Sequence, residues 1–126
     1  MAASEIRPKY LNLLRIRMPV GAVTSFAHRL SGVLLFLALP YGLYLFDLSL
    51  QNPEGFARAA ALVHTPLVRV LSILLVWSLA HHLLAGLRFL LIDLDIGVAR
   101  RGARRSAWVV NMAALLLVLA YAGSIL

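Results

Sequence analysis

Two adjacent histidines inside an apolar stretch of the chain are the residues best suited to chemistry. His81 and His82 fall within a run from about Leu67 to Ile92, and roughly 20 apolar residues are enough to cross a bilayer. Ionisable side chains at that depth normally face a bundle interior, a cofactor or a water-filled cavity. Gly86 follows His82 by four residues and therefore shares its helix face. An imidazole beside bare backbone can ligate a flat cofactor such as haem, because the missing side chain lets the ring edge approach. Hydrogen bonding of the histidines to neighbouring helices is the alternative.

A second polar cluster opens an earlier apolar segment. Ser25, His28, Arg29 and Gly32 follow the spacing i, i+3, i+4, i+7, so a helix places them along one stripe. An interfacial anchor, with Arg29 reaching toward lipid headgroups, would account for the arginine alone. It would not explain why the other three residues share its face. The stripe therefore indicates a pocket wall.

The composition is that of a membrane protein. Of the 126 residues, 62% are hydrophobic and the mean hydropathy is +0.89, whereas soluble domains are about 45–50% apolar. The chain has no cysteine, which excludes disulfides, iron–sulfur ligation and thiol chemistry within it. Its net charge is +7, but the arginines flank apolar runs, so membrane topology explains them better than nucleic-acid binding does. We expect no cleaved signal peptide.

The apolar segments predict an all-α membrane protein with three transmembrane helices, at about 24–48, 67–92 and 107–126. They form a single membrane-anchor domain over residues 1–126, with a basic N-terminal segment, 1–23, that lies on the membrane surface or against a soluble partner.

Two shorter features are expected between the spans. Pro40 falls inside the first span, where we expect a kink. In the first loop, the turn that begins at Asn52 leads into a short interfacial helix, Phe56 to Val63. His64 follows at the water boundary and is not expected to be a ligand.

Arginine and lysine counts predict the orientation. The N-terminal segment and the loop at 93–106 are rich in them, whereas the loop at 49–65 has only Arg58. The positive-inside rule therefore places the N-terminus in the cytoplasm and the C-terminus outside. His82 lies about eleven residues before Asp93, hence roughly 16 Å from the cytoplasmic boundary. The histidines and the stripe then occupy the same half of the membrane, as one polar site reached from the cytoplasm.

Several motifs resemble a known family. They are Ser25-x-x-His28-Arg29-x-Ser31-Gly32, then His82-x-x-x-Gly86-x-Arg88 with Asp93 closing the helix, then Asn52-Pro53-Glu54-Gly55-Phe56, and an N-terminal pattern of Arg7-Pro8, Leu11, Leu13, Ile16-Arg17 and Pro19. In these motifs and their order, over nearly the whole chain, the sequence resembles the cytochrome b556 subunit of bacterial succinate dehydrogenase, part of respiratory complex II. The first motif is quite specific, whereas the second alone would be weak.

The resemblance implies a haem-binding helical bundle shared with a second small three-span anchor subunit. The two anchors would hold one haem b and dock a flavoprotein and an iron–sulfur subunit at the cytoplasmic face of the bacterial inner membrane. In this electron-transport enzyme of the tricarboxylic acid cycle, electrons from succinate would pass through flavin and iron–sulfur clusters to ubiquinone. By the match, His82 is the axial ligand of the haem iron, His28 and Arg29 lie near the haem propionates, and Ser25 and Arg29 bind the quinone. The flavin site lies in another subunit, so no catalytic residue is assigned to this chain.

Two departures from the family pattern concern the haem. Phe89 stands where the family often has histidine, which implies that a propionate or water contact is lost. His81 precedes the ligand and could compete with it, but adjacent helical residues point about 100° apart. Because Gly86 shares the face of His82, whereas Ala85 shares that of His81, we predict that His82 is the ligand and that His81 hydrogen-bonds to a neighbouring helix.

Three alternatives remain open from the sequence. The first is the anchor of a quinol:fumarate reductase that uses menaquinone. The others are a haemless structural anchor and a small proton or ion conduit.

Overall fold

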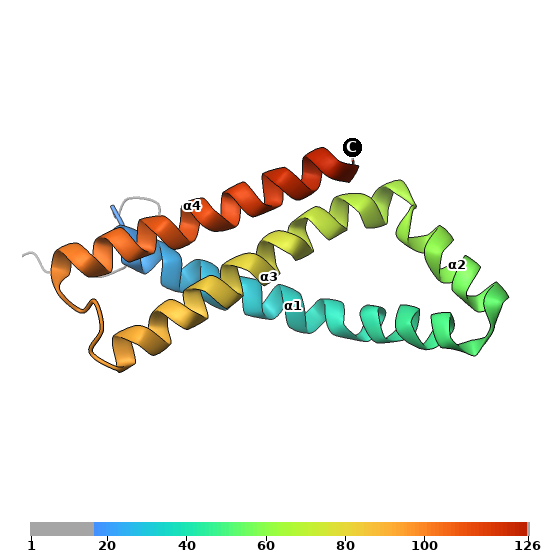
Figure 1. Cartoon of the computed structure of the whole chain (residues 1–126), viewed down its shortest axis with the longest axis horizontal. Helices are drawn as coiled ribbons and strands as arrows, with labels where there is room; N and C mark the ends of the chain where they lie inside the picture. Colours follow the sequence, from blue (N-terminus) through green and yellow to red (C-terminus); the bar gives the residue numbers. More distant parts are fainter. Residues whose placement is uncertain (1–16, 126) are drawn as a thin grey trace, which may run out of the picture.

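The computed structural model describes residues 17–125, which fold into four helices (Figure 1). Three are long, namely α1 (Val20–Gln51), α3 (Pro66–Asp93) and α4 (Arg100–Ile125), and the short α2 (Pro53–Val63) lies between α1 and α3. Each long helix is apolar enough and long enough to cross a membrane. The predicted all-α fold with three spans is therefore confirmed. The predictions for positions 1–16 lie outside the described residues.

The helices extend beyond the apolar segments that predicted them. α1 begins at Val20 and α4 begins at Arg100, ahead of the expected starts near 24 and 107. The added residues of α4 are mainly arginine and alanine, which favour helix, so the polar flank of that span remains helical. The 32 residues of α1 are about 48 Å long, against about 30 Å for the hydrocarbon core of a bilayer. α1 is therefore long enough for its ends to reach the headgroup regions of a bilayer.

The long helices form a crossed arrangement rather than a parallel bundle. α3 packs on both α1 and α4, and α1 also contacts α4. In Figure 1 the N-terminal half of α1 crosses the C-terminal half of α3, and the two helices diverge beyond the crossing, where α2 spans the gap between them. Since α1 and α3 meet near His28 and His82, the crossing brings together the two polar clusters that the sequence singled out.

The turn between α1 and α2 depends on one asparagine and one glycine. The side-chain oxygen of Asn52 accepts a hydrogen bond of 2.7 Å from the backbone N–H of Gly55, which caps α2. A side chain at Gly55 would collide with the backbone oxygen of Leu48. The predicted turn and short helix are thus confirmed, although the helix already begins at Pro53; its place at the membrane interface stays a prediction.

Pro40 does not end α1, which continues for eleven residues beyond it. Proline lacks the backbone N–H that would normally bond to the carbonyl four residues earlier. Spanning helices tolerate such an interruption when neighbouring groups or water satisfy the carbonyl.

Small residues pack the interface between α3 and α4. On α4, the buried positions are Ala107, Val110, Ala114 and Val118. On α3, they are Ser78, His81, Ala85 and Arg88. Both sets follow helical spacing, and small side chains let two helices approach closely in a membrane. The polar residues of α3 at these positions are therefore enclosed by α4.

Candidate functional site

His82 is anchored to α1 through one ring nitrogen. Its Nδ1 lies 3.1 Å from the backbone oxygen of His28 and 3.3 Å from the hydroxyl oxygen of Ser31. The hydroxyl of Ser31 itself donates to the same backbone oxygen, at 2.8 Å. A neutral ring with its proton on Nδ1 satisfies this arrangement by donating to the carbonyl. The lone pair of Nε2, which makes no hydrogen bond within residues 17–125, is then available to a ligand.

The crossing of α1 and α3 is reciprocal, since each helix presents a histidine to a glycine of the other. The rings of His28 and His82 stack with centroids 4.1 Å apart and planes 8° from parallel. A Cβ at Gly32 would lie 3.0 Å from Cε1 of His82, and a Cβ at Gly86 would lie 3.5 Å from Nε2 of His28. From the sequence, the bare face of Gly86 was expected to lie against the edge of a cofactor. In this structure it lies against the imidazole of His28 on α1.

The four residues of the predicted stripe on α1 do not all lie at the crossing with α3. His28 and Gly32 lie against α3. Ser25 is half-buried and Arg29 is exposed. Among the residues of α1, Thr24 and Ser31 are fully buried, so the enclosed face is centred about one residue away from the stripe that the sequence predicted.

His81 faces α4 and belongs to a separate polar cluster. It is only 2% exposed, and its Nε2 lies 3.1 Å from the side-chain oxygen of Asn111. The hydroxyl of Thr24 lies 3.2 Å from the same oxygen, so one amide joins all three long helices. The predicted hydrogen bond from His81 to a neighbouring helix is confirmed. The Nδ1 of His81 is buried without a partner among the residues that the structure describes.

The sequence reasoning missed Thr24 as a partner in this cluster. Its signal was present, because Thr24, His28 and Ser31 follow the spacing i, i+4, i+7, which also defines one helix face.

Arg88 ties α3 to the beginning of α4. It is 8% exposed, and its Nε donates to the hydroxyl of Ser106 at 2.9 Å while Nη2 donates to the backbone oxygen of Ala103 at 3.0 Å. The neighbouring Phe89 packs edge-on against His28, with ring centroids 5.3 Å apart. The residue that departs from the family pattern therefore supports the stacked histidines by an aromatic contact.

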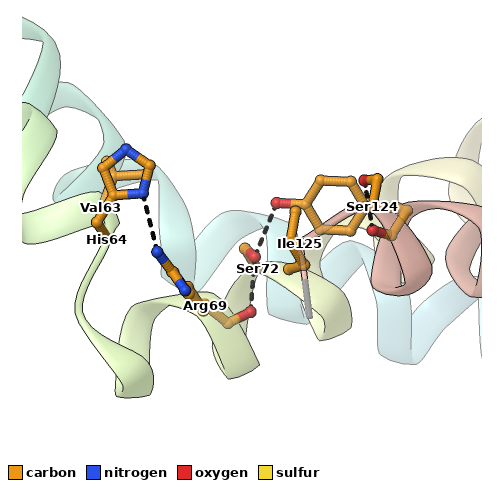
Figure 2. Close-up of a pocket in the computed structure, with 7 residues that line it drawn as sticks. Val63, His64, Arg69, Ser72, Ser124 and Ile125 are labelled. Carbon is orange, nitrogen blue, oxygen red and sulfur yellow. Dashed lines mark hydrogen bonds between the residues drawn. The ribbon is translucent and has the colours of Figure 1, made fainter.

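A cavity of about 280 Å³ lies at the other end of α4, near its C-terminus (Figure 2). His64 and Arg69 lie at its edge, with 3.4 Å between Nδ1 and Nη2, and the hydroxyl of Tyr121 donates to that of Ser72 at 2.9 Å. His64 is exposed and takes no part in the crossing of α1 and α3.

Over residues 17–125, no three His, Cys, Asp or Glu side chains converge as they would around a metal ion. Of the two imidazoles at the crossing, that of His82 has its ring fixed by a hydrogen bond to α1 and offers its second nitrogen, Nε2, as a donor. That is what one axial position of a haem iron requires, because the macrocycle supplies the other four nitrogens.

These features define a class of protein, a three-span membrane subunit with an imidazole site between two crossed helices. The chain belongs to the succinate dehydrogenase/fumarate reductase transmembrane subunit family, whose profile matches residues 3–121. It is 31% identical over 105 residues to the succinate dehydrogenase cytochrome b556 subunit of Coxiella burnetii (strain RSA 493 / Nine Mile phase I). The aligned region covers 82% of this chain and 84% of that relative. It is also 31% identical over 101 residues to the subunit of the same name from Paracoccus denitrificans, which covers 80% of this chain and 78% of that relative. The resemblance stated from the sequence is therefore confirmed.

Proposed function

We propose that this chain is the haem b-binding anchor subunit of a succinate:quinone oxidoreductase, with Nε2 of His82 as one axial ligand of the iron. The hydrogen bond from Nδ1 of His82 to the backbone oxygen of His28, 3.1 Å long, is the observation that carries this proposal. Metal-ligating histidines almost always donate their second ring N–H to a carbonyl, a carboxylate or water, which fixes the ring and raises its basicity. The name cytochrome b556, carried by both relatives, supports a b-type haem.

The stacking of the two histidines supports a second subunit as the source of the other axial ligand. A bond from imidazole to iron lies in the plane of the ring, so two axial imidazoles lie end to end across the metal. His28 and His82 lie face to face, 4.1 Å apart, and this arrangement cannot place both on one iron. The second ligand would come from a histidine of a second small three-span anchor subunit.

We assign the quinone site to Ser25 and Arg29, as the family motif implies. The exposure of Arg29 supports this role, because its side chain is accessible to a ligand or a partner beside the helix. A serine hydroxyl donates to a quinone carbonyl, and an arginine stabilises the negative charge that develops on reduction. His28 and Arg29 would also lie near the haem propionates.

The same proposal places the chain in the bacterial inner membrane with its N-terminus in the cytoplasm and its C-terminus in the periplasm. The iron–sulfur and flavoprotein subunits would dock on the cytoplasmic side, where the predicted topology would place the four arginines in the first two turns of α4. The haem carries electrons when bound, whereas this chain supplies the ligand, the orientation of the ring and the polar groups around the quinone.

A matched pair of histidine variants tests the ligand assignment. His82→Ala should remove or strongly perturb the low-spin haem spectrum of the assembled complex. His81→Gln should leave it largely unchanged, because glutamine can keep a hydrogen bond to Asn111. Reduced-minus-oxidised spectra, normalised to assembled complex, give the comparison. A normal spectrum in His82→Ala together with loss in His81→Gln would move the ligand to His81.

The second-subunit proposal has its own test. Expressed without partners, the chain should not give a stable six-coordinate haem spectrum. A six-coordinate spectrum from this chain alone would contradict the need for a second subunit.

The quinone assignment is tested by separating two activities of the complex. Ser25→Ala and Arg29→Ala should depress quinone reduction but leave succinate oxidation by a soluble artificial acceptor largely intact, because the flavin site lies in another subunit. Equal loss of both activities would contradict a role confined to the quinone site.

A further inference from the structure

Three arginines line a cavity of about 480 Å³ at the end of the molecule where α1 and α4 begin. Arg88 comes from α3, whereas Arg100 and Arg104 come from the first two turns of α4. Residues 18–21, around the start of α1, complete the walls together with Ala103 and Trp108 of α4. None of the described residues that line the cavity is acidic.

Arg88 is held in place before any ligand binds. Its hydrogen bonds to Ser106 and to the backbone of Ala103 use two of the five N–H donors of the guanidinium. Three donors remain on a side chain that is 8% exposed and borders the cavity. Little conformational entropy is left to lose, so the guanidinium is a preorganised donor for an acceptor in the cavity.

The charges around the cavity are unfavourable for the helices themselves. Four of the first six residues of α4 are arginine, and its first turn has no acidic residue, although a helix N-terminus favours negative charge. α1 also begins without an acidic residue in its first turn and without a side-chain cap, and the first N–H groups of a helix have no intrahelical partner. Two positive helix ends and three guanidinium groups therefore surround one space, and an anion there would relieve their mutual repulsion.

The position of the cavity favours a lipid as the source of the anion. Trp108 is half exposed, as is typical of tryptophans at the interface of a membrane. Basic pockets between spanning helices bind anionic headgroups, and the guanidinium fork matches a phosphate bidentately. Arg88 lies on the face of α3 that packs against α4, which His81 and Ala85 share, so the cavity is separate from the site of His82.

We propose that this cavity binds the phosphate of an anionic phospholipid headgroup, with Arg88, Arg100 and Arg104 as its donors. A free phosphate ion would offer the same chemistry. The cavity lies at the membrane interface, where headgroups are concentrated, and we therefore assign it to the lipid.

The test uses the full chain, purified from membranes with the subunits that accompany it, and compares two double variants. Arg100→Gln/Arg104→Gln removes two cavity arginines. Arg101→Gln/Arg105→Gln removes the same charge from the same turns of α4, but neither of these arginines lines the cavity. After delipidation in mild detergent, phosphatidylglycerol or phosphatidylcholine is titrated in, and native mass spectrometry counts the lipids bound.

We expect the wild type and the control variant to bind one phosphatidylglycerol per copy in preference to phosphatidylcholine. The cavity variant should bind phosphatidylglycerol roughly thirtyfold more weakly, which corresponds to about 1 kcal/mol for each arginine near the headgroups. If the double variants do not accumulate, the single pair Arg104→Gln and Arg105→Gln gives the same comparison, with an expected difference of about fivefold.

Four results would overturn the proposal. Equal weakening in the two double variants would indicate a diffuse basic surface instead of a site. Absence of any preference for phosphatidylglycerol would exclude an anionic headgroup. Displacement of the lipid by inorganic phosphate at millimolar concentration would assign the cavity to a soluble anion. Loss of an accompanying subunit from the cavity variant, at unchanged lipid affinity, would assign the cavity to a protein contact.

Discussion

Replacing Gly32 by alanine should displace the imidazole of His82 from its anchored position. The added Cβ would lie 3.0 Å from Cε1 and 3.4 Å from Nδ1 of that ring. Ordinary van der Waals contact begins near 3.4 Å. The imidazole of His82 must therefore move by a few tenths of an ångström. Both acceptors of Nδ1 lie on α1, as Gly32 does. The new methyl group therefore pushes the ring away from them.

The size of the effect follows from the hydrogen bonds. The contacts of Nδ1, at 3.1 Å and 3.3 Å, are already at the long end of the range for N–H···O bonds, about 2.7–3.2 Å. A further few tenths of an ångström would break them, at a cost of about 1 kcal/mol. Replacing glycine by alanine within a helix contributes about 1 kcal/mol in the opposite direction. The stability of the fold should therefore hardly change, whereas loss of a hydrogen bond that orients a metal ligand lowers metal affinity by about 10–100-fold.

Haem content and the reduced spectrum of the assembled complex measure this prediction, and Gly86→Ala is the matched control. A Cβ at Gly86 would meet Nε2 of His28 at 3.5 Å, which is ordinary van der Waals contact. Gly32→Ala should lower haem occupancy or shift the spectrum, and Gly86→Ala should do so far less. The opposite order would refute the reasoning, because it would mean that Gly86, and not Gly32, borders the cofactor.

Three further predictions concern other parts of the chain. Asn111→Leu should lower the free energy of unfolding by about 1–3 kcal/mol, because it leaves the buried Nε2 of His81 without its partner, and thermal unfolding in detergent measures the change; an unaltered midpoint would contradict the role of the amide. Ser106→Ala removes the acceptor of Nε of Arg88 and should cost about 1.5–3 kcal/mol, as for a hydrogen bond to a charged group, with the same assay and with Ser124→Ala, on the exposed end of α4, as the control. Reporter fusions after Gly55 and at the C-terminus should both report an external location, as the arginine distribution predicts; a cytoplasmic signal from either would contradict the topology.

The sequence was a good guide to elements and to helix faces. The three spans, the short helix after Asn52 and the end of α3 at Asp93 all follow from apolar runs and turn residues, and the structure has each of them. The hydrogen bond from His81 to a neighbouring helix, predicted from the spacing of the two histidines, is also present. The roles of His82 in haem ligation and of Arg29 in quinone binding stay predictions.

What the sequence could not supply is which faces meet. Helical periodicity places His28 and Gly32 on one face, and His82 and Gly86 on another, but it cannot show that each histidine lies against the glycine of the other helix. The bond between Thr24 and Asn111 joins residues 87 positions apart, and its formation depends on how α4 packs on the other helices. The offset of the buried face of α1 has the same origin, because the packing partner decides where the centre of a face lies.

The crossed arrangement also divides α1 into two parts that should differ in how freely their sequence can change. Both fully buried residues of α1, Thr24 and Ser31, lie within its first thirteen residues, together with His28 and Gly32. The remaining nineteen residues have no buried side chain within the described chain, and that part diverges from α3 (Figure 1). If only contacts within this chain constrained α1, the first part would have to keep its particular residues, whereas the second part would have to keep only apolar side chains. Any position in the second part that tolerates few substitutions would therefore mark a contact with a neighbouring subunit.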